Sequence, residues 1–276
     1  MQMFCVCGGR LTCYYLGLRK SRRAPINRGR SEGSKDPSLP NGCMKKILII
    51  PTYNEAENIR PLVEQVLERV PDMHVLICDD NSPDGTGGIA DELAQEHEDV
   101  RVVHRPGKMG LGSAYVMGFK KAVAEGYECV CHMDADFSHD PKYWPDLLEG
   151  MAGHDVMIGS RYVPGGGTRN WGLHRRLLSR TSNFIARILL GIRVRDCTGG
   201  FRCYRAGVLE KIGLDSIFSE GYSFLEEVLY KAVRAGASVG EVPIIFVERR
   251  LGKSKISRKE IFKAVITLLR LRFKKN

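Results

Sequence analysis

Short apolar runs alternate with stretches of helical spacing along most of this chain. The runs are typical of strands buried on both faces of a parallel sheet, and they occupy residues 47–50, 75–78, 100–103, 127–132 and 156–159. After the first run, Ile59, Leu62, Val63 and Val66 recur at the spacing of one helix face. This alternation, without internal repeats, predicts a doubly wound α/β sheet, at least in the first half of the chain.

The second half has a weaker pattern. It predicts helices and strands over residues 172–190 (helix), 201–204 (strand), 224–235 (helix) and 244–247 (strand). Residues 164–168 form a glycine-rich loop. The Gly110-Leu111-Gly112 sequence is neither a dinucleotide fingerprint nor a P-loop, so we expect a flexible connection there.

The formal charge of +10 is unevenly distributed. Residues 1–43 hold eight Lys/Arg against two Asp/Glu, and residues 249–276 hold eleven against one, so residues 44–248 carry a net charge of −6. Residues 1–43 lack sustained periodicity and end in a Ser/Gly/Pro/Lys-rich stretch, which predicts a disordered, non-catalytic extension. We expect the catalytic domain over 44–256 and a basic amphipathic helix over 257–276.

The nine cysteines form no paired Cys-x-x-Cys pattern, and several lie in apolar strand patterns, so a reduced, intracellular protein is expected. The sequence has no run of about 18 apolar residues, so no transmembrane helix is predicted. Arg10 and Arg19 interrupt the apolar region that a secretory signal would need.

Polar residues follow three of the predicted strands, at residues 51–55, 79–85 and 134–138. Because the carboxyl ends of parallel strands meet at one rim, we expect these loops to converge. Glu55 and Asp80 could accept hydrogen bonds from a nucleobase or from ribose hydroxyls, and Tyr53 could stack on the base or pack beneath it. Each residue alone is more often a cap or turn residue, but together they suit a nucleotide-diphosphate pocket.

The third loop carries Asp134 and Asp136 one residue apart, with Ser138 beside them. Carboxylates with a nearby hydroxyl suit a hard divalent cation, Mg²⁺ or Mn²⁺, which readily bridges carboxylate and diphosphate oxygens. The alternative is an acidic turn that only caps the following helix.

From Lys45 onward the chain resembles a glycosyltransferase family 2 protein of GT-A fold, and closely resembles the catalytic domain of the dolichyl-phosphate (polyprenyl-phosphate) mannose synthases. The resemblance covers about residues 44–270. It rests on Pro51-Thr52-Tyr53-Asn54-Glu55, Asp79-Asp80-Asn81-Ser82-Pro83-Asp84-Gly85-Thr86, Met133-Asp134-Ala135-Asp136, Gly159-Ser160-Arg161-Tyr162, Gly199-Gly200-Phe201, Glu241-Val242-Pro243, Phe246, Arg249 and the loop with Gly252, Ser254 and Lys255.

The resemblance implies one Rossmann-like domain, with a mostly parallel sheet flanked by helices, followed by the C-terminal helix. It also implies GDP-mannose as the donor, bound by Pro51, Tyr53, Glu55, Cys78 and Asp80, with donor and metal held at Asp134, Ala135, Asp136 and Ser138. Some relatives carry Gln at position 138, and the shorter Ser138 leaves either direct ligation or a bridging water. Arg161, Arg249 and Lys255 match positions that contact donor phosphates or the lipid phosphate, and Asp134, Asp136 and Arg161 would form the catalytic group.

The implied reaction needs no general base, because a phosphate monoester is already mostly ionised near neutral pH, with a second pKa of about 6. The metal would stabilise the departing diphosphate, and direct displacement would invert the sugar carbon to give a β-linked mannosyl phosphate. The acceptor would be polyprenyl (dolichyl) phosphate at the cytoplasmic face of a membrane. The 257–273 helix, apolar with interspersed Lys and Arg, would bind that surface, or else pack on the domain or dock a small membrane-anchoring partner subunit.

Three alternatives remain at this point. A UDP-glucose-dependent transferase acting on the same acceptor fits the same pattern, since spacing does not reveal base or sugar preference. A catalytically silent nucleotide-sugar binder is disfavoured because none of the expected charged residues is missing. Nucleic-acid binding is not expected, because the basic ends lack interleaved stacking aromatics.

Overall fold

The computed structural model describes residues 44–219, 221, 223–248 and 258–273, with the side chains of the last range described from Ile266 onward. The described residues belong to one compact unit. The predicted disordered extension over residues 1–43, together with Arg249 and Lys255, lies outside the described residues.

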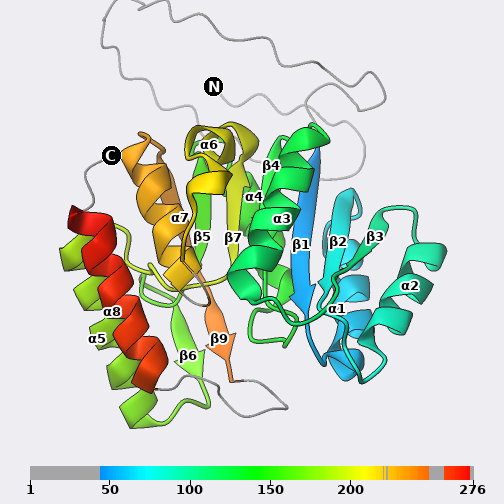
Figure 1. Cartoon of the computed structure of the whole chain (residues 1–276), viewed down its shortest axis with the longest axis horizontal. Helices are drawn as coiled ribbons and strands as arrows, with labels where there is room; N and C mark the ends of the chain where they lie inside the picture. The colour runs from blue at the N-terminus through cyan, green and yellow to red at the C-terminus, as the bar shows by residue number, and fades with distance from the viewer. Residues whose placement is uncertain (1–43, 220, 222, 249–257, 274–276) are drawn as a thin grey trace, which may run out of the picture. The chain divides into compact units, whose positions relative to one another are not determined.

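A seven-stranded sheet in the order β3-β2-β1-β4-β7-β5-β8 forms the centre of this unit (Figure 1). Its strands are β1 (Lys46–Thr52), β2 (Met73–Asp79), β3 (Val100–His104), β4 (Cys129–His132), β5 (Val156–Ser160), β7 (Arg202–Arg205) and β8 (Val239–Pro243). All neighbouring strands are parallel except that β7 runs antiparallel to both β4 and β5. The mostly parallel α/β sheet expected from the sequence is confirmed.

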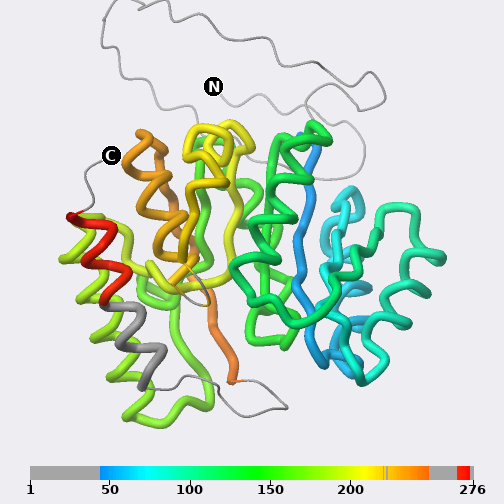
Figure 2. The backbone as a smooth tube through the Cα atoms, in the orientation of Figure 1, coloured from blue at the N-terminus to red at the C-terminus, as the bar shows by residue number. Residues whose placement is uncertain are grey.

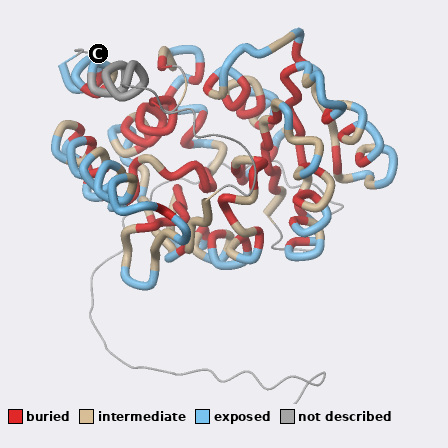
Figure 3. Tube along the Cα trace, turned by 90° about the horizontal axis from the view of Figure 1, so that it is seen from below, coloured by how far each residue is buried: buried red, intermediate tan, exposed pale blue. Residues whose placement is uncertain are grey.

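Helices cover both faces of the sheet. They are α1 (Ala56–Arg69), α2 (Thr86–Glu96), α3 (Leu111–Ala124), α4 (Trp144–Gly150), α5 (Leu173–Leu190), α6 (Ala206–Lys211), α7 (Ser223–Arg234) and α8 (Arg258–Phe273), with 3-10 turns η1 (Pro141–Tyr143) and η2 (Leu214–Ser216). Successive strand residues point to opposite faces, so Ile47 and Ile49 pack with α3, α6 and α7, whereas Leu48 and Ile50 pack with α1, α2 and α4. Figure 3 shows the strands and the inward sides of these helices buried.

Helix α3 approaches the sheet closely because Gly118 has no side chain. A Cβ at that position would lie 2.7 Å from the Ile49 side chain. The apolar residues of α3 thereby reach the sheet, and the helix begins at Leu111, directly after the loop at 105–110.

Three elements differ from the sequence expectation. The glycine-rich segment at 164–168 is not only a loop, because Gly167–Arg169 forms β6, which pairs in parallel with β9 (Ile245–Val247). Strand β8 and helix α6 have no counterpart in the prediction. Both are short, and β8 is partly exposed and contains Gly240 and Pro243, so it lacks the continuous apolar run of the other strands.

Helix α8 occupies most of the predicted C-terminal segment and lies against α5 and α7, as the tube in Figure 2 also shows. Its Leu268 and Leu271 are buried, whereas Ile266, Leu269 and Phe273 are exposed. Helix α8 therefore packs on the domain with some of its apolar side chains and exposes others. None of the helices in the described part of the chain is long and apolar enough to cross a bilayer.

Candidate active site

The three polar loops expected at one rim follow adjacent strands. β1 pairs in parallel with β2, where Thr52 faces Asp79, and with β4, where Ile49 faces His132. The carboxyl ends of these strands therefore lie side by side, which confirms the predicted convergence of the strands that carry the loops.

Each of the three loops contains a residue with positive φ: Asn54 (62°), Asn81 (55°) and Phe137 (58°). Asparagine tolerates the left-handed region, but a bulky residue there is an outlier. Phe137 lies between Asp136 and Ser138, so the acidic turn keeps a costly backbone conformation at the place where the sequence predicts ligand binding. Such strain is often retained at functional sites.

The loop after β2 combines a structural and an ion-paired aspartate. Asp79 accepts a hydrogen bond from Thr52 Oγ1 (2.9 Å), which ties β1 to β2, and a second one from Ser82 Oγ in the loop after β2 (2.6 Å). Asp80 forms an ion pair with Arg105 (2.6 Å) and accepts a hydrogen bond from the Met109 backbone N–H. Burial raises the pKa of Asp80, and the adjacent Arg105 opposes that shift.

The acidic turn after β4 is mostly buried. Asp136 and Ser138 are almost fully enclosed, and the Ser138 N–H donates to Asp136 Oδ1 at 3.0 Å. Asp134 Oδ1 accepts a hydrogen bond of 3.2 Å from the hydroxyl of Tyr115 on α3. Burial, and next the charge of Asp134, raise the pKa of Tyr115 well above its usual range, so this hydroxyl remains a donor.

The donor set of the turn fits a divalent cation. Two carboxylates and a hydroxyl are hard oxygen ligands of the kind that Mg²⁺ and Mn²⁺ prefer. Behind them, His139 is buried and stacks on Phe201, with ring centroids 5.2 Å apart. Burial lowers the pKa of His139 to about 4, so the imidazole is neutral at pH 7 and places no positive charge beside the carboxylates.

Arg161, from the end of β5, is held by a buried carboxylate. Its Nε and Nη2 donate to the two oxygens of Asp196 at 2.8 and 2.7 Å, and Nη2 also donates to Thr198 Oγ1 at 2.7 Å. Asn183 of α5 donates to the same hydroxyl. This bidentate pair fixes the guanidinium in one orientation.

Arg161 and Asp196 each stabilise the charged form of the other. Burial alone would favour neutral forms, but the attraction to Asp196 outweighs it and raises the pKa of Arg161, while the pKa of Asp196 is lowered by its partner against the effect of burial. Asp196 in turn accepts the Arg161 backbone N–H, and its own N–H donates to Glu241. The Arg161 guanidinium lies 5.4 Å from the centroid of the Phe246 ring, and the ring of His139, which follows the acidic turn, lies 5.1 Å from the same centroid, so Arg161 is near that turn.

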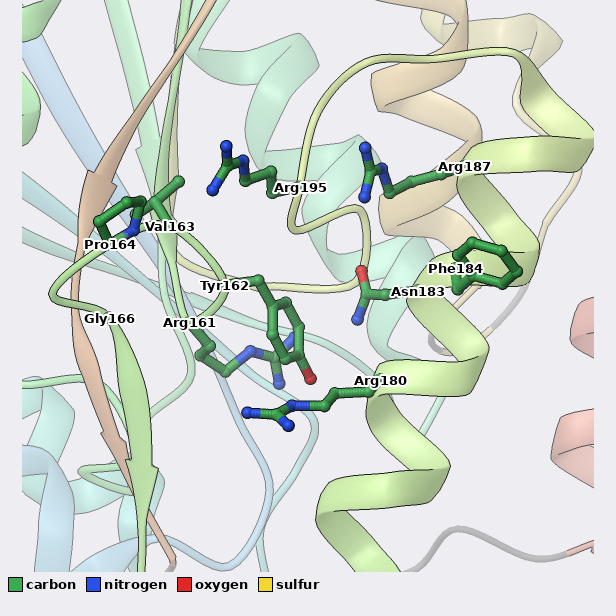
Figure 4. Close-up of a pocket in the computed structure, with 10 residues that line it drawn as sticks. All are labelled: Arg161, Tyr162, Val163, Pro164, Gly166, Arg180, Asn183, Phe184, Arg187 and Arg195. Atoms are coloured by element: carbon green, nitrogen blue, oxygen red, sulfur yellow. The ribbon is translucent and has the colours of Figure 1, made fainter.

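A cavity of about 610 Å³ opens beside Arg161 (Figure 4). It is lined by Arg161, Tyr162, Val163, Pro164, Gly166, Arg180, Asn183, Phe184, Arg187 and Arg195. Four of these residues are arginines and none is acidic. Figure 4 shows Arg180 and Asn183 reaching from α5 toward the loop that carries Arg161 and Tyr162. The cavity therefore suits an anionic ligand.

The remaining predicted site residues lie in or beside the same rim. Pro51 and Cys78 are register partners on β1 and β2, and burial raises the pKa of Cys78 to about 12, which keeps it a thiol. The ring of Tyr53 is covered by Lys108, whose Nζ lies 4.2 Å from the ring centroid. Glu55 accepts a hydrogen bond from Asn58, and Ala135 is buried between the two aspartates of the turn.

Several residues beside the rim and the cavity were not predicted from the sequence: Arg105, Tyr115, His139, Asn183, Asp196, Thr198, Arg180, Arg187 and Arg195. Arg105 and Lys108 belong to a loop that we expected to be only a flexible connection. In the structure Arg105 pairs with Asp80, and Lys108 covers Tyr53. The sequence predicted Arg161 as a phosphate contact. Its pairing with Asp196, 35 residues further along the chain, could not be predicted from the spacing of residues.

The model of glycosyl transferase family 2 matches residues 47–213. The chain belongs to this family. It is 47% identical over 239 residues to the polyprenol monophosphomannose synthase of Mycolicibacterium smegmatis, covering 86% of this chain and 90% of that protein. It is 44% identical to the undecaprenyl-phosphate mannosyltransferase of Micrococcus luteus, covering 82% and 93%.

Two solved structures have a similar fold at lower sequence identity. Glucosyl-3-phosphoglycerate synthase from Mycobacterium tuberculosis, solved with Mn²⁺ and UDP, superimposes with a TM-score of 0.59 at 18% identity, covering 84% of this chain and 81% of the other. The mannosyltransferase PcManGT from Pyrobaculum calidifontis, solved with GDP-mannose and Mn²⁺, gives a TM-score of 0.52 at 15% identity, covering 83% and 70%. These matches confirm the GT-A fold expected for the family 2 chain.

Proposed function

We propose that this family 2 glycosyltransferase moves mannose from GDP-mannose to a polyprenyl monophosphate, with inversion to a β-linked mannosyl phosphate. The observation that carries the proposal is the adjacency of two unlike surfaces: an acidic turn suited to a metal-bound diphosphate, and an arginine-lined cavity suited to a second anion. Arg161 lines the cavity, and its guanidinium contacts the same Phe246 ring as His139, the residue that follows Ser138 of the turn. The names of the two curated relatives, which both refer to polyprenyl-phosphate mannosyl transfer, support the same donor sugar and acceptor.

In this proposal each surface has one task. Asp134 and Asp136, with Ser138, would hold Mg²⁺ or Mn²⁺, which supplies charge stabilisation for the departing diphosphate. Pro51, Tyr53, Glu55, Cys78 and Asp80 would border the nucleoside. The chain also has Arg249 and Lys255, outside the described residues, for the phosphates.

The cavity would receive the phosphate end of the acceptor. Arginine forks bind phosphate oxygens in a bidentate geometry, and Arg161 is pre-oriented by Asp196. An acceptor phosphate is already ionised near neutral pH and attacks without a general base.

The proposed reaction is tested with the purified full-length chain, Mn²⁺ or Mg²⁺, radiolabelled sugar nucleotides and polyprenyl phosphate in detergent. We expect a solvent-extractable mannolipid from GDP-mannose, and none when the unphosphorylated polyprenol replaces the phosphate. A UDP-glucose arm separates the glucosyltransferase alternative. Product from UDP-glucose alone, or no product from any donor, would reject the proposal.

The same proposal requires a surface that meets the bilayer where the acceptor resides. Helices α5 and α8 lie against each other, and both expose large apolar side chains: Leu173, Leu177, Leu178, Phe184, Ile185 and Ile188 on α5, with Ile266, Leu269 and Phe273 on α8. Leu173 is 82% and Ile188 62% exposed. The residues Arg175, Arg176 and Arg180 lie among the apolar residues of α5.

An apolar surface flanked by arginines is typical of an interfacial helix attracted to anionic lipid. We therefore propose peripheral attachment of the α5–α8 surface to the cytoplasmic face of a membrane. A small membrane-anchoring subunit would be the alternative occupant of the same surface.

Replacing Leu177 and Ile188 with Glu should reduce co-sedimentation with phosphatidylglycerol vesicles about tenfold or more, because two exposed apolar side chains that would enter the bilayer are lost and two negative charges are placed against anionic lipid. Gln95→Glu on α2, an exposed position on another helix, adds charge without touching this surface and should leave binding unchanged. Equal vesicle binding by the double variant and the original chain would contradict the bilayer assignment. Loss of binding without loss of transfer in detergent is the expected pattern.

A further inference from the structure

Three cysteines outside the proposed active site converge on one face of the sheet. Cys129 and Cys131 are on β4, two residues apart and so on the same face, and Cys203 on β7 is the direct register partner of Cys131. The Sγ atoms of Cys131 and Cys203 are 3.3 Å apart, those of Cys129 and Cys131 3.7 Å, and all three lie within 4.8 Å of one another. All three side chains are fully buried.

From this geometry we propose that the three thiols form a binding site for copper(I). Three sulfurs at a metal–sulfur distance of about 2.3 Å in a trigonal plane would be separated by about 4.0 Å, which the observed triangle can reach with small rotamer shifts. Soft thiolate ligands select Cu(I) and Zn²⁺ among common ions. Zn²⁺ in structural sites is almost always four-coordinate, and among the described residues no fourth His, Cys, Asp or Glu joins this group.

The surroundings of the three sulfurs also suit a soft ion. The same core cluster contains the thioethers of Met133, Met151 and Met157, and Met157 on β5 is the register partner of Cys203. A soft thioether side chain is therefore on the residue paired with Cys203, and no carboxylate of the described residues joins the three sulfurs, unlike the carboxylate turn at the rim.

Charge balance is the main obstacle to a buried thiolate site. On binding, three S–H bonds break, three Cu–S bonds form and three protons leave, so that the complex carries a net charge of −2. Lys46 on β1 and Arg205 on β7 are the register partners of Cys129 on its two sides, and cross-strand partners share a face. These two cations offset the charge, although each also contacts a partly exposed aspartate, Asp72 and Asp155 respectively.

Because the three sulfurs are enclosed, the ion would enter as the chain folds or opens locally, as in other sites where metal binding and folding are coupled.

The test uses full-length protein in which Cys5, Cys7, Cys13 and Cys43 are replaced by Ser, since these thiols lie outside the described residues and would compete. Cu(I) is supplied anaerobically against a competing chelator, both to native protein and during refolding. We expect a 1:1 complex that survives competition, and a thermal midpoint raised by about 5–10 °C when free Cu(I) is roughly 100-fold above its Kd. Zn²⁺ should give a smaller shift.

Cys131→Ala and Cys203→Ala, made separately in this background, should each abolish the 1:1 complex and the thermal shift. Cys197→Ala removes a buried thiol outside the cluster and should leave both unchanged. If the background protein shows neither stoichiometric Cu(I) binding nor a thermal shift, native or refolded, the proposal is overturned, whatever the variants do. Equal binding by the Cys131→Ala variant would also overturn it.

Discussion

Asp136→Asn should reduce mannosyl transfer by about 10³-fold or more while the fold stays intact. Asp136 is nearly buried, and its Oδ1 accepts the Ser138 backbone N–H at 3.0 Å, which is an Asx-type turn. Asparagine preserves that hydrogen bond but removes the negative charge. If the side chain only shapes the turn, activity should survive, whereas a metal ligand that stabilises a departing diphosphate should not be replaceable.

The same loop offers a matched control for this substitution. Asp140 Oδ1 accepts the Lys142 backbone N–H, also at 3.0 Å, and so makes a comparable turn nearby without belonging to the proposed ligand set. Asp140→Asn should therefore retain most of the transfer activity. Manganese binding, measured by electron paramagnetic resonance in the presence of GDP, should be lost in Asp136→Asn and kept in Asp140→Asn. Full manganese binding by Asp136→Asn would show that the metal is held elsewhere.

The first half of the fold could be predicted from the sequence because its strands are continuous apolar runs. Residues 47–50 and 75–78 lie inside β1 and β2, and the turns that follow them carry the polar residues that the motifs indicated. Here local pattern and global topology agree, so hydrophobic periodicity alone places the rim of the site.

The second half could be predicted only in part because its structure depends on distant pairing. Strand β6 exists through its register with β9, 78 residues further along the chain at Gly167 and Ile245, and nothing local distinguishes it from a loop. The antiparallel direction of β7 is likewise a property of its two neighbours. Motif resemblance identified Arg161, but the buried carboxylate that orients it became apparent only in three dimensions.

Removing that carboxylate has the second large expected effect. Asp196→Ala should lower the free energy of unfolding at pH 7 by about 3–5 kcal/mol, because it leaves Arg161 buried without its counter-charge. Transfer activity should fall as well, since the guanidinium is no longer held in one orientation. Arg161→Lys should retain the charge but lose the bidentate geometry, and so should also impair transfer.

The pH dependence of stability separates this ion pair from a general packing effect. The pKa of Asp196 is lowered by Arg161 despite the burial that opposes ionisation. A lowered folded-state pKa contributes stability that is present above the unfolded value of about 3.9 and is lost as the pH falls through the folded value. The stability difference between the original chain and Asp196→Asn should therefore be constant from about pH 5 to 8 and shrink in acid. Urea unfolding at a series of pH values measures this stability difference.

The control is Asp215→Asn, which removes an exposed ion pair with Lys120 and should change the free energy of unfolding by less than about 1 kcal/mol. A stability difference for Asp196→Asn that persists unchanged at pH 2 to 3 would mean that Asp196 acts through shape and hydrogen bonding and that its charge does not orient Arg161.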